Sequence, residues 1–411
     1  MEVYLVGGAV RDELLGLPVE EQDWCIVGAT PAELEALGYR PVGKDFPVFL
    51  HPDTREEYAL ARTERKTSSG YHGFTFNTST EVTIEEDLKR RDLTINAIAK
   101  NIDGEIIDPY KGLDDLNNKI LRHVSIAFTE DPVRILRVAR FAAHFAAHRF
   151  TIADETLQLM REMVINGEAD TLAPERVWRE TEKALNGENP HIFFQTLKDC
   201  GALTNTFPEL DGLYGIPQPK KWHPEIDCGL HTLMVLEQAA MLSHEVDVRF
   251  AALVHDLGKA TTQKDKLPHH TGHEKRSKKI IEKLSKRMPI PKACLQLGQI
   301  AAQFHTYCHK AFELRPTTIL KVLDRTDAFR RPQRFEKFLL VCEADARGRT
   351  GLENRDYPQA DYLRQAFRIV QKMQVNKLNI KNLDGAAIGK KLRASRLDAL
   401  KHFKTSYEPP K

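Results

Sequence analysis

The stretch VYLVGGAVRDELLGLPVEEQDWCIVG, residues 3–28, decides the fold of the first part of the chain. VYLVGG reads as a short apolar strand that ends in paired glycines, and AVRDELLG reads as a short helix that ends at Gly16. DWCIVG reads as a second strand. The chain therefore opens with a mixed α/β arrangement. Residues two apart in an extended segment share a face, so Glu21 and Asp23 are expected to project together.

Length and composition describe a globular protein of several domains. The 411 residues suggest two to four domains, and 41% apolar with 29% charged residues is typical of a soluble chain. A net charge of +2 does not by itself indicate a nucleic-acid partner. Six cysteines without a CxxC pair predict free thiols and exclude a zinc ribbon. With no signal-peptide core and no apolar run of spanning length, the sequence predicts a cytoplasmic protein without membrane contact.

Changes in pattern along the chain predict four parts. Strand-like pieces such as FPVFLH, and a helix expected over DLKRRDLTINAIAKN (87–101), form a head over residues 1–125. Helical spacing from residue 129 onward predicts a helical neck over 126–214. A proline-rich linker at 215–226 opens a histidine-rich part over 215–330, and a helical tail follows over 331–411. Within that tail, residues 371–411 hold ten Lys or Arg against three acids, a net +7 that makes this segment the clearest basic region of the chain.

The acidic pair in the head is a candidate magnesium site. Magnesium prefers carboxylate oxygens and needs few protein ligands when phosphates supply the rest, so Glu21 and Asp23 fit, with Glu57 as a third catalytic carboxylate. The neighbouring GGAVRD joins strand to helix, where backbone N–H groups and Arg11 attract phosphate. The simpler alternatives are a solvated strand face and an ordinary tight turn. The combination of turn and acids favours the metal site.

Two sets of arginines suit a nucleotide. RRDLTINA begins with Arg90 and Arg91, and EDPVRILRVARF places arginines at 134, 137 and 140 on one face of a helix. Asp131 suits its N-cap and Pro132 its first position. Arginine's planar fork recognises phosphates and base edges. A solvated helix face is the alternative, but apolar residues on most other sides indicate a packed helix.

These motifs together resemble the bacterial tRNA nucleotidyltransferases that add CCA, in the eubacterial-type branch of the polymerase β superfamily. The resemblance extends from Met1 to about residue 360 and includes YLVGGAVRD, DFPVFLHP, EEYALARTER, DLKRRDLTINAIA, EDPVRILRVARF and PERVWRE. It implies an α/β nucleotidyltransferase head followed by a mostly α-helical neck, body and HD domain. One departure is Glu21, where many relatives have aspartate.

The resemblance also implies an activity and roles for individual residues. The activity is template-independent addition and repair of the 3′-terminal CCA of tRNA, using CTP and ATP and releasing pyrophosphate. Magnesium would be held by Glu21 and Asp23, and Asp131 and Arg134 would pair with base edges. ATP and CTP would be bound by these two and by the remaining residues of the set, Gly8, Arg11, Arg91, Arg137 and Arg140.

A histidine-rich region resembles an HD phosphohydrolase domain. Its segments are CGLHTLMVL, LVHDLGKA, LPHHTGH and AAQFHTYCH. The resemblance implies His255 and Asp256 as catalytic residues, and a divalent transition metal, with nickel among the candidates, held by His231, His255, Asp256 and His305. Relatives with this domain show phosphatase, 2′-nucleotidase and 2′,3′-cyclic phosphodiesterase activities. Thr306 stands where an aspartate is expected after His305. Lone histidines are more often packed or surface residues, so the HD doublet carries this interpretation.

Two alternatives remain open from the sequence. A poly(A)-adding relative would share the head motifs, although the histidine-rich region and the modestly basic tail argue against it. An HD hydrolase with a noncatalytic RNA-binding head is the other, although Glu21, Asp23 and the arginines argue against it. A monomer and a homodimer are equally compatible with the sequence.

Overall fold

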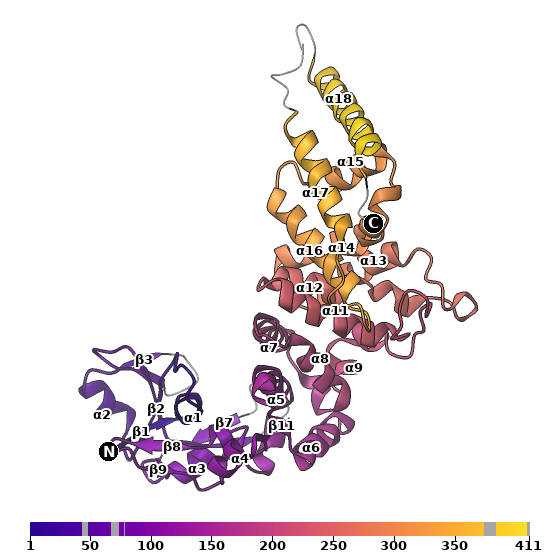
Figure 1. The fold of residues 1–411 in the computed structure, drawn as a ribbon. Helices are drawn as coiled ribbons and strands as arrows, with labels where there is room; N and C mark the ends of the chain where they lie inside the picture. Colours follow the sequence, from indigo (N-terminus) through magenta and orange to yellow (C-terminus); the bar gives the residue numbers. More distant parts are fainter. Residues whose placement is uncertain (43–47, 67–73, 78, 374–383, 409–411) are drawn as a thin grey trace. The chain divides into compact units, whose positions relative to one another are not determined.

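The computed structural model describes residues 1–42, 48–66, 74–77, 79–373 and 384–408, and Figure 1 shows an α/β head followed by a long series of helices. The predicted fold class is confirmed. Contacts divide the chain into two compact units, residues 1–184 with 192–206 and residues 185–191 with 207–411. The four finer parts stay predictions. Parts of the DFPVFLHP segment and of the basic tail lie outside the described residues.

The head is built on a seven-stranded mixed sheet with strand order β3-β4-β5-β2-β1-β8-β9. Its strands are β1 (Glu2–Val6), β2 (Asp23–Val27), β3 (Arg40–Val42), β4 (Val48–Leu50), β5 (Glu57–Leu60), β8 (Ala99–Asn101) and β9 (Ile106–Ile107). The central strand β2 pairs antiparallel with β1 and parallel with β5. Two smaller pairs lie outside this sheet, β6 (Thr63–Lys66) with β7 (Phe74–Asn77) and β10 (Ile120–Leu121) with β11 (Thr151–Ile152).

Both faces of the sheet are covered, as strand β2 illustrates. Cys25 belongs to one apolar cluster with Leu88, and Ile26 belongs to another with Leu34. Successive strand residues point to opposite faces, so β2 contributes to both clusters and has no solvated face at these positions. The short helices of the head are α1 (Gly8–Leu14), α2 (Pro31–Ala36), α3 (Ile84–Lys89) and α4 (Gly112–Asn118).

The helix predicted over residues 87–101 is wrong. Helix α3 ends at Lys89, a 3-10 turn η1 spans Thr94–Asn96, and strand β8 begins at Ala99. The cause is Asp92, whose carboxylate accepts the N–H of Leu93 at 2.9 Å while Leu93 is extended. An aspartate that binds neighbouring backbone in this way competes with helix formation. The apolar residues after it therefore enter the sheet.

A layer of helices completes the first unit. The helices after the head are α5 (Val133–His144), α6 (Asp154–Ile165), α7 (Pro174–Asn186), α8 (Pro190–Asp199) and α9 (Leu203–Thr206). Helix α5 begins one residue later than predicted: Pro132 is its N-cap, and Asp131 accepts the N–H of Val133 at 3.1 Å. Its buried residues include Ile135, Leu136 and Val138, which confirms a packed helix.

The second unit is helical in the described residues. It contains α10 (Pro208–Asp211), α11 (Cys228–Leu242), α12 (Val246–Val254), α13 (His273–Arg287), α14 (Lys292–His309), α15 (Pro316–Arg325), α16 (Pro332–Arg347), α17 (Pro358–Gln371) and α18 (Gly385–Ser406). Short 3-10 helices in the chain are η2 (Ile126–Glu130), η3 (Ala146–His148), η4 (Glu168–Thr171), η5 (Leu257–Thr261), η6 (Lys264–Lys266) and η7 (Ala311–Glu313). The core of this unit includes the fully buried Phe335, Phe338 and Tyr362.

Two further findings concern the whole chain. The six cysteines are buried free thiols, as predicted from their spacing. A search of the described residues finds no helix with both the length and the apolar character needed to cross a bilayer.

Candidate functional site

A glycine turn joins β1 to α1 beside two of the predicted nucleotide ligands. Gly7 has a φ of 73°, a backbone conformation that residues with a side chain rarely adopt. A Cβ added there would lie 2.7 Å from Arg91 Nη1. A Cβ on Gly8 would lie 3.4 Å from Arg11 Nη2. The lack of side chains at Gly7 and Gly8 therefore allows two guanidinium groups to lie close to the turn, an arrangement that suits phosphate.

Two of the three predicted acids of the head lie at the start of neighbouring strands. Asp23 is the first residue of β2, and Glu57, the first of β5, is its register partner. Glu21 precedes β2, so its predicted place on the strand is wrong, because β1 already ends opposite Asp23 at Val6. All three acids are exposed. Among the described residues they do not form a trio whose oxygens lie within 4.8 Å of one another.

The environment of Asp23 affects its charge. Surrounding protein displaces water from the carboxyl and raises its pKa, and the nearby Glu21 carboxylate raises it further, whereas Arg91 opposes both effects. A cation bound between Glu21 and Asp23 would relieve their repulsion. The donor set, exposed carboxylates with room for water, fits magnesium.

Polar side chains connect the glycine turn to helix α5. Arg11 is buried and donates from Nη1 to Asn96 Oδ1 at 2.5 Å. Asn96 Nδ2 donates to Asp92 Oδ1 at 3.0 Å, and Arg137 Nε donates to Asp92 Oδ2 at 2.6 Å. Burial raises the pKa of Asp92, but Arg137 and these hydrogen bonds outweigh burial and lower it. Asp92 and Asn96 thus position two predicted nucleotide ligands, a role that the sequence pattern did not reveal.

The two residues predicted to read the base, Asp131 and Arg134, are bonded to other protein groups in this structure. Arg134 donates to the carbonyl oxygens of Ala127 at 2.7 Å and Arg90 at 2.6 Å. Asp131 instead accepts two hydrogen bonds from Arg176, at 3.0 and 2.8 Å. Both residues lie where predicted on α5 or at its start, but each has a different partner.

Three arginines of the predicted nucleotide-binding set lie around one aromatic ring. The guanidinium carbons of Arg11, Arg137 and Arg140 lie 5.4, 5.6 and 4.3 Å from the centroid of the Phe141 ring. Arg140 Nε also donates to Glu180 Oε2 at 2.6 Å. Cations near a ring face are attracted by its negative charge density. The structure therefore brings three of the predicted nucleotide ligands together around Phe141.

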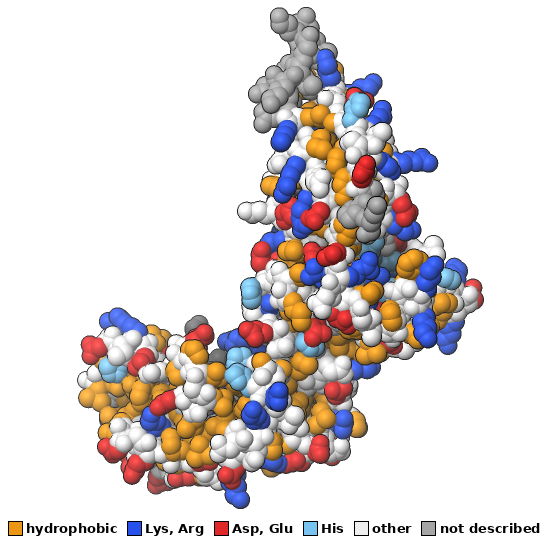
Figure 2. Space-filling view, viewed as in Figure 1, with side chains coloured by type: hydrophobic (Ala, Val, Ile, Leu, Met, Phe, Trp, Pro, Cys, Tyr) orange, Lys and Arg blue, Asp and Glu red, His pale blue; other side chains and the backbone are white. Residues whose placement is uncertain are grey.

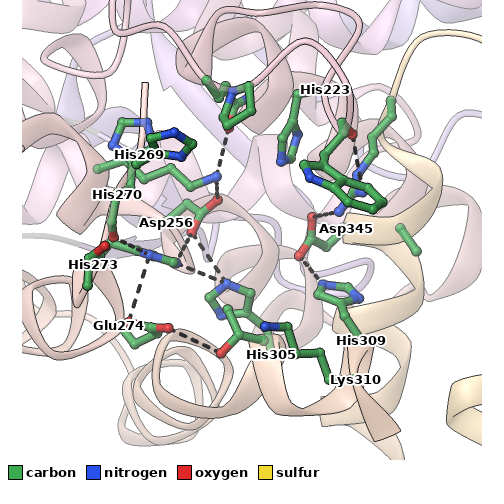
Figure 3. A pocket seen from close by; sticks show the side chains of 18 of the residues that line it. His223, Asp256, His269, His270, His273, Glu274, His305, His309, Lys310 and Asp345 are labelled. Atoms are coloured by element: carbon green, nitrogen blue, oxygen red, sulfur yellow. Dashed lines mark hydrogen bonds and ion pairs between the residues drawn. The ribbon is translucent and has the colours of Figure 1, made fainter. Parts of the chain in front are cut away.

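A second candidate site is a buried cluster of histidines and aspartates in the second unit, and Figure 3 labels four of its members, Asp256, His273, His305 and Asp345. We call it the histidine cluster; its members are His231 (α11), His255 and Asp256 (after α12), His273 (α13), His305 (α14) and Asp345 (α16). Each member is at most 8% exposed. Imidazoles and carboxylates from helices far apart in the chain therefore lie together in the interior of the unit.

The two aspartates hold the cluster together. Asp256 Oδ1 lies 3.1 Å from His273 Nε2 and 3.5 Å from His305 Nε2, and its Oδ2 lies 3.2 Å from His255 Nε2. Asp345 Oδ1 lies 3.2 Å from His231 Nε2. Such short contacts among buried groups of both charge signs are typical of functional sites.

Burial and charge shift the pKa values of these groups in opposite directions. Burial alone disfavours the charged imidazole of His255, but Asp256 and Asp345 raise its pKa to about 9. For His305 burial dominates and lowers the pKa to about 3. Burial would raise the pKa of Asp256, yet Lys259 and His255 hold it well below its usual value. Burial therefore favours the neutral imidazole of His305, the form that binds a metal, whereas His255 would have to release a proton on metal binding.

The histidine cluster fits a divalent metal. Among the described residues, Nε2 of His231 and Nε2 of His255 are buried and make no well-aligned hydrogen bond, although each lies 3.2 Å from a carboxylate oxygen of the cluster, so both nitrogens are available to a metal. Four groups have their donor atoms within 4.8 Å: His223–Glu225–His231, His231–His255–Asp256, His255–His305–Asp345 and Asp256–His273–His305. Mixed imidazole and carboxylate donors suit transition ions. All four ligands predicted from the sequence, His231, His255, Asp256 and His305, belong to these groups.

Asp345 is the residue that sequence reasoning missed. The acid expected directly after His305 is replaced by Thr306, which donates to Glu274 Oε1 at 3.2 Å. Asp345 supplies the second carboxylate of the cluster from a helix forty residues further along the chain. A usable signal was present: helical spacing places Asp345 on the same face as Phe338, Val341 and Cys342, and an acid on an apolar face needs a buried partner.

A pocket of about 750 Å³ opens onto the histidine cluster. Its lining includes Asp256, His273, His305 and Asp345, and it has cationic side chains from Lys259, Lys310, Arg349 and Arg355. Lys259 Nζ lies 2.6 Å from Asp256 Oδ2. The volume is in the range of small-molecule sites, and the cations suit an anionic ligand.

Three family models match the chain. The poly A polymerase head domain matches residues 3–122, and the probable RNA and SrmB-binding site of polymerase A matches residues 149–213. The HD domain matches residues 229–331. Asp345 lies beyond the last of these matches.

Curated relatives match over almost the whole chain. The multifunctional CCA protein of Thioalkalivibrio sulfidiphilus (strain HL-EbGR7) is 60% identical over 99% of this chain and 100% of its own length. That of Acinetobacter baumannii (strain AYE) is 56% identical over 99% of both chains.

Solved structures share the fold. A CCA-adding enzyme in complex with ATP has a TM-score of 0.66 and 19% identity, over 97% of this chain and 86% of the other. The Thermotoga maritima CCA-adding enzyme complexed with tRNA has a TM-score of 0.61 and 20% identity, over 100% of this chain and 88% of the other.

Proposed function

The chain belongs to the family of multifunctional CCA proteins, and we propose that it adds and repairs the 3′-terminal CCA of tRNA from CTP and ATP without a template, releasing pyrophosphate. The observation that carries the proposal is the head edge where Asp23 and Glu57 are register partners next to the Gly7 turn and Arg91. That edge has acids that suit a metal, and the Arg91 guanidinium beside the glycine turn suits phosphates.

In this proposal the head acids hold magnesium and the turn holds the nucleotide. Glu21 and Asp23 would bind the metal, with Glu57 as a further carboxylate. Bound magnesium would polarise the α-phosphorus and lower the pKa of the attacking 3′-hydroxyl. The turn at Gly8 and the guanidinium groups of Arg11 and Arg91 would orient the triphosphate in line with that hydroxyl.

Helix α5 would complete the nucleotide site. Arg137 and Arg140 would contact ribose and phosphates, and the Phe141 ring beside them keeps their guanidinium groups close together. Base reading by Asp131 and Arg134 stays a prediction. It requires Arg134 to exchange a carbonyl acceptor for a base and Asp131 to share its carboxylate with Arg176.

The tRNA would lie along the helices that follow the head. The match to an RNA-binding family model over residues 149–213 supports this placement. Helix α18 exposes Lys390, Lys391, Arg393 and Lys401, and Figure 2 shows basic side chains along the C-terminal helices. Such residues would contact backbone phosphates. Monomer or homodimer, and cytoplasmic location, stay predictions.

We further propose that the histidine cluster is a metal-dependent phosphohydrolase, with phosphatase, 2′-nucleotidase and 2′,3′-cyclic phosphodiesterase activities. His231, His255, Asp256 and His305, joined by Asp345, would hold a transition ion such as nickel. That ion would activate water for attack on phosphorus. The cationic lining of the pocket would hold the phosphate in place.

One assay separates the candidate functions. The protein is incubated with magnesium, labelled CTP or ATP, and tRNA that lacks its last three nucleotides. Ordered addition of CCA that is lost in Asp23→Ala and kept in Glu20→Ala, an exposed acid nearby, is the expected result. Unlimited addition of A would indicate a poly(A)-adding enzyme. If nothing is incorporated while phosphatase activity is present and lost in His255→Ala, the chain is a hydrolase with a noncatalytic head.

A further inference from the structure

An exposed tryptophan lines the pocket of the histidine cluster. Trp222 is 59% exposed and belongs to the same pocket lining as Asp256 and His305. The other two tryptophans differ, since Trp24 is half-buried and Trp178 is 5% exposed. A large indole in water beside a polar pocket is a surface that an aromatic ligand can cover.

The backbone of Trp222 is tied to the acids of the cluster. Arg349 Nη1 donates to the carbonyl oxygen of Trp222 at 3.3 Å, and its Nη2 lies 3.4 Å from Asp345 Oδ1. The Arg349 guanidinium therefore joins the loop that carries Trp222 to Asp345, a metal ligand proposed from the structure.

A second contact anchors the same loop at Gln218. Lys259 Nζ donates to Gln218 Oε1 at 2.7 Å and lies 2.6 Å from Asp256 Oδ2. Gln218 is 2% exposed, so this is a buried anchor. With both links in place, the indole is held near a fixed point of the pocket edge, which favours a defined stacking surface.

The charges of the pocket indicate what else the ligand carries. Lys310, Arg349 and Arg355 line it together with Trp222, and the Lys221 ammonium lies 4.8 Å from the indole centroid. Cations suit phosphate and the indole suits a flat ring, so the combination describes a nucleoside phosphate better than a sugar phosphate or a phosphoprotein.

We propose that Trp222 stacks on the nucleobase of a nucleoside 2′-phosphate or 2′,3′-cyclic phosphate, and so determines the preference of this pocket for nucleotides over other phosphoesters. The proposal rests on the phosphohydrolase function proposed above. In it the phosphoester faces Asp256 and His305, and the base lies against the indole. Trp222 is a specificity residue that touches the base, not the reacting atoms.

The first test compares hydrolysis of two substrates by the full-length protein loaded with nickel or manganese. One is adenosine 2′-phosphate, and the other is methyl riboside 2-phosphate, which lacks a base. Because stacking on an aromatic side chain is worth about tenfold or more in affinity, Trp222→Ala should raise KM about tenfold for the adenosine substrate only. Trp222→Phe should restore most of the loss. Met241→Ala, which removes an apolar side chain that is 70% exposed and outside the pocket lining, should change neither KM.

The second test measures binding without turnover. In EDTA, adenosine 2′-phosphate should quench the tryptophan fluorescence of the full-length protein, and Trp222→Phe should abolish the quenching.

The outcomes separate the two proposals. If the protein hydrolyses both substrates but Trp222→Ala changes KM equally for the two, or for neither, Trp222 does not select the base. Together with fluorescence quenching that persists in Trp222→Phe, that result would overturn the stacking role, and the phosphohydrolase proposal would remain. Absence of hydrolysis with every metal would overturn the phosphohydrolase, and the fluorescence result would then decide the stacking role by itself.

Discussion

Replacing Asp92 with asparagine should destabilise the head and weaken binding of both nucleotides. Asp92 is 6% exposed; one carboxylate oxygen accepts the N–H of Leu93 and Nδ2 of Asn96, and the other accepts Nε of Arg137 at 2.6 Å. An asparagine has one acceptor oxygen and one NH2 group. Whichever way the amide turns, its NH2 therefore faces a donor.

The expected size of the effect follows from these contacts. Removing one partner of a fully buried ion pair costs about 3–5 kcal/mol. The Arg137 side chain is 38% exposed, so water compensates part of the loss. We expect the free energy of unfolding of the head to fall by about 2–3 kcal/mol. This corresponds to roughly 30- to 150-fold faster amide exchange at positions where exchange requires opening of the head.

The assay is hydrogen–deuterium exchange of peptides from β1 and β2, alongside KM for CTP and ATP in CCA addition. Asp103→Asn removes the same charge from an exposed turn of the head and is the matched control. KM should rise for both nucleotides, because Arg137 is predicted to contact ribose and phosphate rather than the base. Exchange and KM values equal to those of the control would refute the role of Asp92.

Three further results are expected. Gly7→Ala places a Cβ 2.7 Å from Arg91 in a residue whose φ is 73°, which costs about 1–3 kcal/mol of backbone strain. Incorporation of labelled CTP should therefore fall. Normal incorporation would contradict the need for glycine at this position. Asp345→Asn should weaken nickel binding by about tenfold or more in calorimetry, as loss of a group supporting a metal site does, and leave CTP incorporation unchanged; unaltered binding would remove it from the site. Burial raises the pKa of Asp87, but Arg90 and Arg91 more than offset this and lower it below 3.8, so its stabilising effect is complete above about pH 4 and lost only below that pH. Urea unfolding of the head should show this loss below about pH 4, and a loss that begins near neutrality would contradict it.

Local motifs allowed much of the head to be predicted. The Gly7–Gly8 pair after an apolar strand fixed the strand–turn–helix unit, because paired glycines and a change of periodicity are readable within a few residues. The error over residues 87–101 has a physical cause: Asp92 binds the backbone N–H of Leu93, and nothing in the helical spacing reports that bond. Glu21 was placed on the strand for a related reason, since strand length depends on where the partner β1 ends.

Contacts between distant segments set the limit for the candidate sites. The doublet His255–Asp256 was visible in the sequence. The second carboxylate of the cluster, Asp345, lies about ninety residues away, and it reaches the cluster only because α16 packs beside α11. Asn96 is a similar case, because its hydrogen bond to Arg11 spans 85 positions. A single sequence reveals residue types and local spacing, and tertiary pairing of polar groups requires the fold.

The two candidate metal sites differ in a way that bears on how one chain would keep two chemistries apart. The head offers exposed carboxylates and no imidazole in its proposed ligand set, whereas the histidine cluster offers four buried imidazoles with two carboxylates. Hard oxygen donors with room for water suit magnesium, and nitrogen donors shielded from water favour transition ions. Selection then depends on donor type and burial, so each site would keep its own ion even when both ions are present.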